Sequence, residues 1–138
     1  MNYLLDTHIL LWVLGEEDKD GQKLPDTVKT ILLNPENTIF YSSINIFETE
    51  LKRIVRPQEN LPSGEELIAF CNDAGFELLR LENKHILAMK TLEKDESVIN
   101  HKDPYDWLLV AQAKTEKMKF ITADSKLKHY IEDCICPI

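Results

Sequence analysis

The chain has 138 residues, of which 43% are hydrophobic and 29% are charged, and its formal net charge at pH 7 is −8. This composition predicts one globular domain over residues 1–138, because a chain of this length buries enough surface to fold without disulfide or metal support. It excludes disordered, collagen-like and disulfide-rich proteins, and the excess of acidic residues argues against tight nonspecific binding to nucleic acid.

The hydrophobic pattern of the first half predicts alternating strands and helices. The expected segments are a strand at 2–5, a helix at 7–14, a polar loop at 15–23, a helix at 25–33, a strand at 38–42 and a helix at 45–55. Pro25 is expected in the first turn of its helix, where its fixed backbone angle is favourable.

The second half continues the alternation after a proline-containing loop. The expected segments are a loop at 56–63, a helix at 64–74, a strand at 76–81, a helix at 84–92, a helix at 104–117, a strand at 119–122, a helix at 125–132 and a strand at 134–137. Gly75 is expected to end one helix and Asn83 to cap the next. The alternation indicates an α/β fold whose central, mainly parallel sheet is covered on both faces.

Membrane segments and disulfides are not expected. No apolar run reaches the ~18 residues that a membrane-spanning helix needs, and the N-terminus lacks the basic start of a signal peptide. The cysteines Cys71, Cys134 and Cys136 are an odd set, which indicates reduced thiols. We therefore expect a cytoplasmic protein that does not associate with a membrane.

Four acidic residues lie where a predicted strand leads into a helix or in the early turns of that helix: Asp6, Glu48, Asp106 and Asp124. Because the carboxyl ends of parallel strands meet at one edge of a sheet, these side chains are expected to converge there.

Helix capping is the alternative explanation for each of these acids. Asp6 and Asp124 precede predicted helices, Asn45 and Glu48 have the spacing of a capping box, and Asp103 precedes a proline at a helix start. Capping alone does not predict an acid at all four junctions, so the functional interpretation is favoured.

The chemistry of a carboxylate cluster points to a divalent cation. Carboxylates packed together repel one another unless a cation joins them, and Mg²⁺ or Mn²⁺ prefers oxygen ligands. A metal ion held in this way activates water and stabilises charge on a phosphoryl oxygen. The reaction that such a site suits best is the hydrolysis of a phosphodiester.

At these residues the sequence resembles the PIN domain family, specifically the toxin component of bacterial VapBC-type toxin–antitoxin pairs. The resemblance covers nearly the whole chain and rests on four motifs in order: YLLDTHILLW at 3–12, SSINIFETELK at 42–52, HKDPYDWLLVAQA at 101–113 and FITADSKLKHY at 120–130. It implies a PIN-like three-layer α/β/α fold and a Mg²⁺- or Mn²⁺-dependent endoribonuclease. It also implies a homodimer, and an antitoxin whose C-terminal segment covers the active site.

By this resemblance, the catalytic metal ligands are Asp6, Glu48, Asp106 and Asp124. Asp103 is then a supporting acid or the helix cap, and Thr122 falls on a small hydroxyl position of the fourth motif. We prefer Asp106 to Asp103 as ligand because its distance to the alanines that follow fits the family better, although either faces the site if the helix is turned suitably. The family often has arginine where this chain has Trp107, which puts substrate contacts in doubt more than metal binding.

Other residues near the motifs have two explanations each. Thr7 and Ser43 flank the acids and are candidates to hold metal-bound water, or they cap helices. Lys52 shares a helix face with Glu48 and either forms a surface salt bridge or orients the acid and meets a phosphate.

Three further residues have a structural explanation as the favoured one. Arg56 belongs to a short basic stretch that either contacts RNA or an acidic partner or, as we favour, forms a solvated face. His8 lies near Asp6 and either approaches the site or, as we favour, is a core or surface residue. Trp12 is interpreted as part of the core or of a dimer surface in preference to a substrate platform.

Two other functions are weighed against the nuclease. A PIN-like module that binds a protein partner and cleaves poorly is suggested by Trp107 and the acidic charge, although the complete set of four acids argues against it. A phosphohydrolase that uses Asp6 as a covalent nucleophile is disfavoured. Such enzymes usually place a second acid two residues later, where this chain has His8, and with four glycines the chain shows no glycine-rich phosphate loop.

Overall fold

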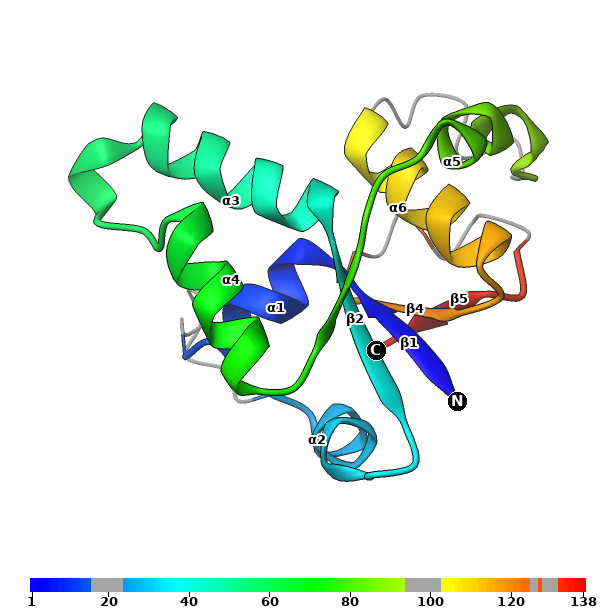
Figure 1. Ribbon diagram of the computed structural model, residues 1–138, viewed down its shortest axis with the longest axis horizontal. Coiled ribbons are helices and arrows are strands. Elements are labelled where there is room, and N and C mark those ends of the chain that lie inside the picture. Colours follow the sequence, from blue (N-terminus) through cyan, green and yellow to red (C-terminus); the bar gives the residue numbers. More distant parts are fainter. Residues whose placement is uncertain (16–23, 94–102, 125–126, 128–131) are drawn as a thin grey trace.

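The computed structural model describes residues 1–15, 24–93, 103–124, 127 and 132–138. Within this part of the chain, five strands form one parallel sheet in the order β3-β2-β1-β4-β5 (Figure 1). The strands are β1 (Asn2–Leu5), β2 (Thr38–Ser42), β3 (Glu77–Leu79), β4 (Lys119–Thr122) and β5 (Ile135–Pro137). The predicted α/β fold with a parallel central sheet is confirmed.

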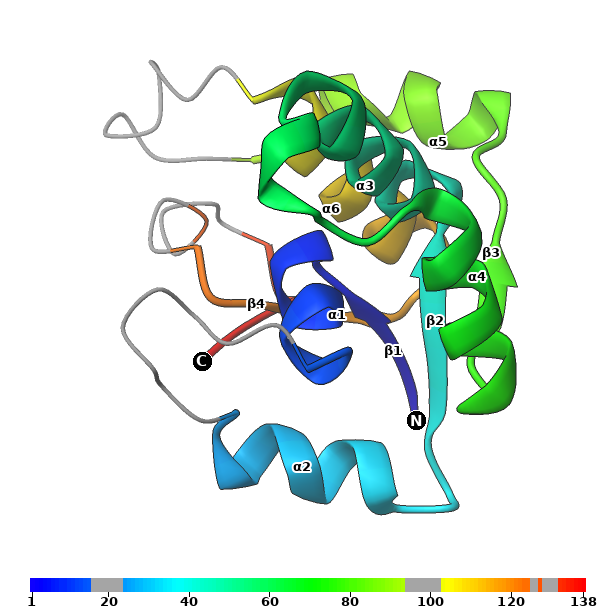
Figure 2. The ribbon, with the colours of Figure 1, turned by 90° about the vertical axis from the view of Figure 1, so that its left-hand side faces the viewer.

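Helices cover both faces of this sheet. They are α1 (Thr7–Val13), α2 (Asp26–Leu33), α3 (Ser43–Val55), α4 (Gly64–Asp73), α5 (Asn83–Ala88) and α6 (Pro104–Thr115), with short 3₁₀ turns η1 (Pro57–Glu59) and η2 (Met89–Thr91). Figures 1 and 2 show α5 and α6 on one side of the sheet and α1 and α4 on the other. The sheet and the helices on its two faces are the three layers of the fold.

Alternating strand residues supply the two hydrophobic clusters that hold the layers together. In β1, Leu4 packs toward α6 and Leu5 packs toward α1, and in β4 Phe120 and Ile121 divide in the same way. All four side chains are fully buried. Strands buried on both faces read as continuous apolar runs, which is why these short segments are recognisable in the sequence.

The chain reverses its direction of travel across the sheet at β1, which has β2 on one side and β4 on the other. From β1 the chain adds β2 and β3 outward, and it then crosses back to add β4 and β5. In open α/β sheets, ligands bind beyond the carboxyl ends of the strands at such a reversal. The ends of β1 and β4 therefore mark the place to look for a site.

The sequence-based boundaries need correction at two helix starts. Helix α3 begins at Ser43 and not at 45, because Ser42 is its cap: the Ser42 hydroxyl accepts the Ile44 N–H at 3.0 Å, and the Ser42 N–H donates to Asn45 Oδ1 at 2.6 Å. The capping box of Asn45 with Glu48, which was the alternative explanation for Glu48, is not formed, because Asn45 closes the box with Ser42. Helix α5 is preceded by Glu82 in the cap position in place of Asn83.

Other segments are shorter than predicted. The strand expected at 76–81 is limited to Glu77–Leu79, and the helix expected at 84–92 divides into α5 and the 3₁₀ turn η2. Pro25 lies at the cap position of α2, one residue before the helix. Apart from Leu127 and Glu132, the helix expected at 125–132 lies outside the described residues.

Gly75 ends α4 as the sequence predicts. Its φ of +78° is in the left-handed region, which favours glycine. The Gly75 N–H bonds to the Asn72 carbonyl at 3.1 Å and the Phe76 N–H to the Cys71 carbonyl at 2.9 Å, the pairing of a Schellman motif. This tight ending turns the chain directly into β3.

The structure bears on two expectations from the sequence, which concern the cysteines and membrane-spanning helices. All three cysteines are free thiols. A search of the described residues for a helix with the length and hydropathy of a membrane span finds none.

Candidate active site

Four acidic residues converge at the edge of the sheet where the chain reverses. Asp6 directly follows β1, Asp124 follows the adjacent β4, Glu48 lies in the second turn of α3, and Asp106 lies in the first turn of α6. All four line one cleft with a volume of about 790 Å³, together with Asp103. The predicted convergence is therefore present in the structure.

Asp6 and Asp124 are linked through Thr122. The Thr122 hydroxyl donates to Asp6 Oδ2 at 2.7 Å and accepts the Asp124 N–H at 3.0 Å. Thr122 is fully buried, and Asp6 is 7% exposed. Asp6 is at the N-cap position, at the start of α1, but its carboxyl makes no side-chain cap hydrogen bond. It is directed by Thr122, and capping does not explain it.

Glu48 is held by a second hydroxyl. The Thr7 hydroxyl donates to Glu48 Oε1 at 2.8 Å and accepts from Asn45 Nδ2 at 2.8 Å. Asn45 is fully buried and also donates to the Leu5 carbonyl at 3.2 Å, so it ties the start of α3 to the end of β1. The amide of Asn45 thus orients the hydroxyl that orients Glu48.

The two acids at the start of α6 differ in position. Asp103 is exposed, and its Oδ1 accepts the Tyr105 N–H at 3.0 Å, which makes it the helix cap. Asp106 is 6% exposed, and its carboxyl forms a hydrogen bond with Asp124. Both line the cleft, but only Asp106 is buried against the other acids.

The electrostatics of the cleft favour a bound cation. Burial, with the charges of Asp6, Asp103 and Asp124, raises the pKa of Asp106 to about 9. Burial, followed by the charge of Asp6, raises the pKa of Glu48 to about 7, although the Thr7 hydroxyl and Lys52 oppose the shift. Burial likewise raises the pKa of Asp6.

These shifts show that the carboxylates of the cleft lack a compensating positive charge. Carboxylates that resist ionisation because they are buried, and because they lie near one another, are stabilised in the ionised form when a cation joins them. Oxygen donors from separate elements, facing one cleft, are the set that a hard divalent ion takes. The oxygen donors of these residues therefore suit the chemistry of a Mg²⁺ or Mn²⁺ ion.

The supporting residues proposed from sequence separate into two groups. Thr7, Lys52 and Asp103 line the cleft, and Thr122 holds Asp6 from behind. Ser43 does not contribute to the cleft: its hydroxyl accepts the Leu81 N–H at 3.4 Å on the other side of the helix start. The expectation for Ser43 is corrected, because the adjacent Ser42 takes the capping role and turns Ser43 toward the β3–α5 connection.

A comparison with protein families decides which family the fold and cleft represent. The model described as PIN domain matches residues 3–132. The chain belongs to the PIN domain family. A comparison of the sequence with curated proteins gives no significant match.

Solved structures with the same fold cover nearly the whole of this PIN domain. They are VapBC2 from Rickettsia felis bound to a DNA fragment from their promoter (18% identity, TM-score 0.68, 100% of this chain and 99% of that chain), a toxin-antitoxin complex from Klebsiella pneumoniae (15%, 0.57, 97% and 95%) and VapBC-1 from nontypeable Haemophilus influenzae (16%, 0.57, 91% and 89%). At these identities the likeness shows the fold.

Trp107 occupies a different environment from the cleft in this PIN domain. It packs against the hydrophobic cluster around Leu109 and Phe120, and it is not among the residues that line the cleft. The residue that replaces the family's frequent arginine therefore belongs to the interior side of α6. The cations that face the cleft come instead from α3.

Sequence reasoning missed several residues of the cleft. Trp12 and His8 on α1 line it, and so does Arg56 at the end of α3, whereas the sequence favoured a structural role for all three. For Trp12 the core interpretation also holds, because it packs against the hydrophobic cluster around Leu5 and Ile9. Asn45 was considered only as a cap. One signal was available: Asn45 lies three residues before Glu48 on the same helix face, as a residue that positions Glu48 would.

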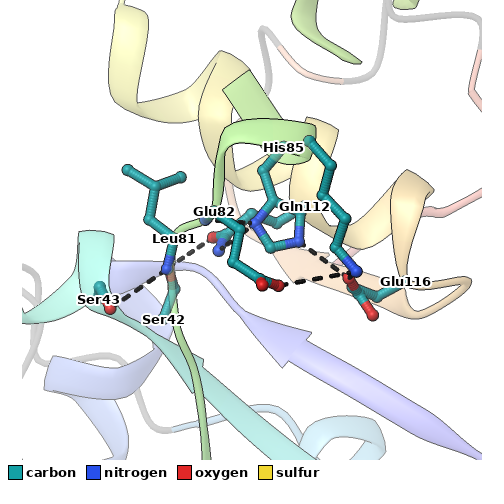
Figure 3. Close-up of polar contacts among 8 residues, drawn as sticks. Ser42, Ser43, Leu81, Glu82, His85, Gln112 and Glu116 are labelled. Carbon is teal, nitrogen blue, oxygen red and sulfur yellow. Dashed lines mark hydrogen bonds and ion pairs between the residues drawn. The ribbon is translucent and has the colours of Figure 1, made fainter. Parts of the chain in front are cut away.

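A buried polar network joins the start of α3 to α5 and α6 (Figure 3). The Ser42 hydroxyl donates to Gln112 Oε1 at 2.5 Å, and Gln112 Nε2 lies 3.5 Å from His85 Nδ1. His85 Nε2 lies 2.9 Å from Glu116 Oε1. Ser42, Gln112 and His85 are fully buried. The network fixes the helix of Glu48 relative to the helix of Asp106.

The polar end of this network resembles a metal site but is already satisfied. Glu82, His85 and Glu116 bring potential ligand atoms within 4.8 Å of one another. However, His85 Nδ1 accepts the Glu82 N–H at 3.0 Å, so the proton on Nε2 faces Glu116. Lys84 Nζ lies 2.8 Å from Glu116 Oε1 and, together with His85, holds the pKa of Glu116 below its usual range. The positive charge of Lys84 balances the negative charge of Glu116, which a metal ion would otherwise do.

Ser42→Ala should destabilise the protein by about 2–3 kcal/mol, because it removes a helix cap and leaves the Gln112 carbonyl oxygen unpaired in the core. Ser63→Ala is the matched control, since Ser63 caps α4 through the Glu66 N–H at 3.1 Å near the surface. It should cost only about 1 kcal/mol. Urea unfolding measures both, and equal costs would show that the Ser42–Gln112 bond adds nothing.

Proposed function

We propose that this PIN domain is a Mg²⁺- or Mn²⁺-dependent endoribonuclease and the toxin of a toxin–antitoxin pair that acts in the cytoplasm. The observation that carries the proposal is the convergence of four acids from four separate elements in one cleft. The raised pKa values of Asp6, Glu48 and Asp106 add the electrostatic reason for a cation at this place.

The metal ligands of the proposal are Asp6, Glu48, Asp106 and Asp124, directly or through water. A divalent ion held there supplies charge stabilisation for a phosphodiester and a more acidic water. Asp106 is the better ligand than Asp103 because it is buried beside Asp6 and Asp124, whereas Asp103 is committed to capping α6.

The residues around the ligands keep them in place. Thr122 and Thr7 donate hydrogen bonds to Asp6 and Glu48 and so fix the orientation of each carboxylate. Lys52 lowers the pKa of Glu48 and so favours its ionised form. Because the hydroxyls are themselves fixed by the Asn45 amide and the Asp124 N–H, the oxygens are positioned before anything binds.

An antitoxin partner and a homodimer complete the proposal. The structural neighbours described as VapBC assemblies and as a toxin-antitoxin complex support a protein partner. Phe47 and Ile54, seven residues apart on α3, are 50% and 67% exposed and offer apolar surface for it. The homodimer remains a prediction that size-exclusion chromatography with light scattering checks.

Cleavage of total cellular RNA by the purified protein, free of any co-purifying partner, tests the proposed activity. We expect cleavage with Mg²⁺ or Mn²⁺ and none with excess EDTA, read by sequencing of the new RNA ends. Internal cuts identify an endonuclease. Cleavage that EDTA leaves unchanged would overturn the metal requirement. An intact RNA pool with every metal would replace the nuclease by the partner-binding module.

A further inference from the structure

The four acids of the cleft are held in place by two different parts of the fold. Asp6 and Asp124 follow the adjacent strands β1 and β4, which pair in one sheet, and Thr122 bonds to both residues. Glu48 and Asp106 lie instead on α3 and α6. The spacing between Glu48 and Asp106 therefore depends on how these two helices pack against each other.

A ring contact and a hydrogen bond join α3 to α6. The rings of Phe47 and Tyr105, whose centroids lie 5.4 Å apart, belong to the residues directly before the two acids. The Ser42 hydroxyl, at the start of α3, donates to Gln112 Oε1 at 2.5 Å (Figure 3). The first residue along α3 thus meets the last along α6, so the helices run in opposite directions where they touch.

The hydrogen bond is the stricter of these two contacts. Ser42 and Gln112 are fully buried, whereas Phe47 is about half exposed. On its other side Gln112 Nε2 faces His85 Nδ1 at 3.5 Å, which keeps Oε1 turned toward Ser42. A buried hydrogen bond has a defined length and direction, and breaking it leaves polar groups unpaired, whereas rings slide past each other at little cost.

The same bond is connected to Glu48 through the start of α3. The Ser42 N–H donates to Asn45 Oδ1 at 2.6 Å, and Asn45 Nδ2 donates to the Thr7 hydroxyl at 2.8 Å. The Thr7 hydroxyl in turn donates to Glu48 Oε1 at 2.8 Å. An unbroken series of hydrogen-bonded residues therefore links Gln112, on the helix of one acid, to the carboxylate of the other.

We propose that Gln112 is a positioning residue that makes the carboxylate cleft selective for Mg²⁺ over the larger Ca²⁺ ion. The proposal rests on the proposed function, because it concerns the metal ion of that site. Mg²⁺ demands near-ideal octahedral geometry with oxygens at about 2.0–2.1 Å, whereas Ca²⁺ takes oxygens at about 2.3–2.6 Å in flexible arrangements. Helices held at a fixed spacing suit the first ion, and helices that are able to shift suit the second.

A residue that only stabilised the fold would have a different effect on metal binding. Its loss lowers the fraction of folded protein and so weakens the apparent affinity for every ion by the same factor. A residue that orients metal ligands changes the geometry of the folded site instead. The ratio of Mg²⁺ affinity to Ca²⁺ affinity therefore separates positioning from stability.

Gln112→Met tests the proposal, because methionine keeps the length of the side chain and removes its hydrogen bonds. Isothermal titration calorimetry at pH 8 gives the dissociation constants of Mg²⁺ and Ca²⁺ for protein free of any co-purifying partner. We expect the variant to bind Mg²⁺ about 10- to 100-fold more weakly, and to lose distinctly less affinity for Ca²⁺, which tolerates a displaced ligand. An equal loss for the two ions, or no loss for either, would overturn the proposal.

Ser42→Ala removes the other half of the same bond, and it carries the test if Gln112→Met does not fold. It should lower the affinity ratio in the same direction. The double variant should resemble Gln112→Met, because two changes to one bond are not additive. Additive effects would mean that Gln112 acts by a route other than Ser42, which would contradict the proposed connection.

Val28→Ala is the matched control for lost stability. Val28 is fully buried on α2, and Figures 1 and 2 show this helix at the opposite end of the molecule from α3. The substitution opens a cavity in the core and should lower the stability to urea. It should leave the ratio of Mg²⁺ to Ca²⁺ affinity unchanged, and a ratio that fell as in Gln112→Met would assign the effect to stability.

RNA cleavage by the same samples separates this proposal from the nuclease. If the unmodified protein cleaves RNA and Gln112→Met keeps the affinity ratio, the positioning role is wrong and the nuclease stands. If the ratio falls in Gln112→Met but the unmodified protein cleaves no RNA, the positioning role stands and the nuclease fails. If the unmodified protein binds neither ion, the metal site and the positioning role fail together.

Discussion

Asp6→Asn should reduce RNA cleavage by about 100-fold or more while the folded structure is retained. The substitution removes one charge from the proposed metal site, where each ligand contributes to holding the ion and to stabilising charge on the phosphate. Asparagine has nearly the shape of aspartate, and its carbonyl oxygen still accepts the 2.7 Å hydrogen bond from Thr122. The loss of activity therefore has a local cause.

The same variant should be at least as stable as the unmodified protein when metal is absent. Burial raises the pKa of Asp6, which means that the folded state disfavours its charge, and asparagine carries no charge to disfavour. Cleavage is measured with Mg²⁺ and stability by urea unfolding in EDTA. Asp73→Asn, an exposed change at the end of α4, is the control that should keep full activity. Full cleavage by Asp6→Asn would remove Asp6 from the metal site.

The sequence predicts best the strands whose residues are buried on both faces of the sheet. Strands β1, β2 and β4 occur at the residues expected, because their side chains pack into the two clusters and leave a short apolar run. The strand β3 lies at the sheet edge and its Glu77 is exposed, so its pattern is weaker and its length was overestimated.

The start of α3 shows why local rules left two solutions. Ser42 with Asn45 and Asn45 with Glu48 both have the three-residue spacing of a capping box. Tertiary contacts select the first, because Ser42 is buried against Gln112 and Glu48 is drawn to Thr7 on another element. The same contacts take Ser43 out of the cleft. Neither partner is visible in the local sequence.

The acids of the site were predictable, and the rest of the cleft was not. Asp6, Glu48 and Asp124 follow the ends of β1, β2 and β4, and a parallel sheet brings such ends to one edge. Asp106 lies in a helix that follows α5 and η2, and the packing of α6 on the sheet brings it to the same edge. Whether Trp12, Lys52 or Arg56 faces the same cleft depends on how α1 and α3 lie against each other. That orientation is set by contacts between distant residues, such as Asn45 with the Leu5 carbonyl, and periodicity within one helix does not contain it.

The metal-free protein should lose stability as the pH rises from about 5 to 8. The pKa of Glu48 is raised from 4.5 to about 7 and that of Asp106 from 3.8 to about 9, so the folded state binds more protons than the unfolded state throughout this window. Stability then falls with pH above the unfolded pKa values and continues to fall until the folded pKa is passed. With about 1.4 kcal/mol for each pKa unit, reduced for solvent screening, we expect a loss on the order of 2–4 kcal/mol.

Mg²⁺ should reverse this loss at pH 8 and have little effect at pH 5, because the ion binds ionised carboxylates and must displace protons at the lower pH. At a Mg²⁺ concentration about 100 times its Kd, the gain is about 2.7 kcal/mol. Urea unfolding in EDTA and in Mg²⁺ at both pH values measures these differences. Asp106→Asn should flatten the pH dependence in EDTA, whereas Asp73→Asn should retain it. A metal-free protein that becomes more stable toward pH 8, or equal stabilisation by Mg²⁺ at both pH values, would contradict a cation site made from these crowded carboxylates.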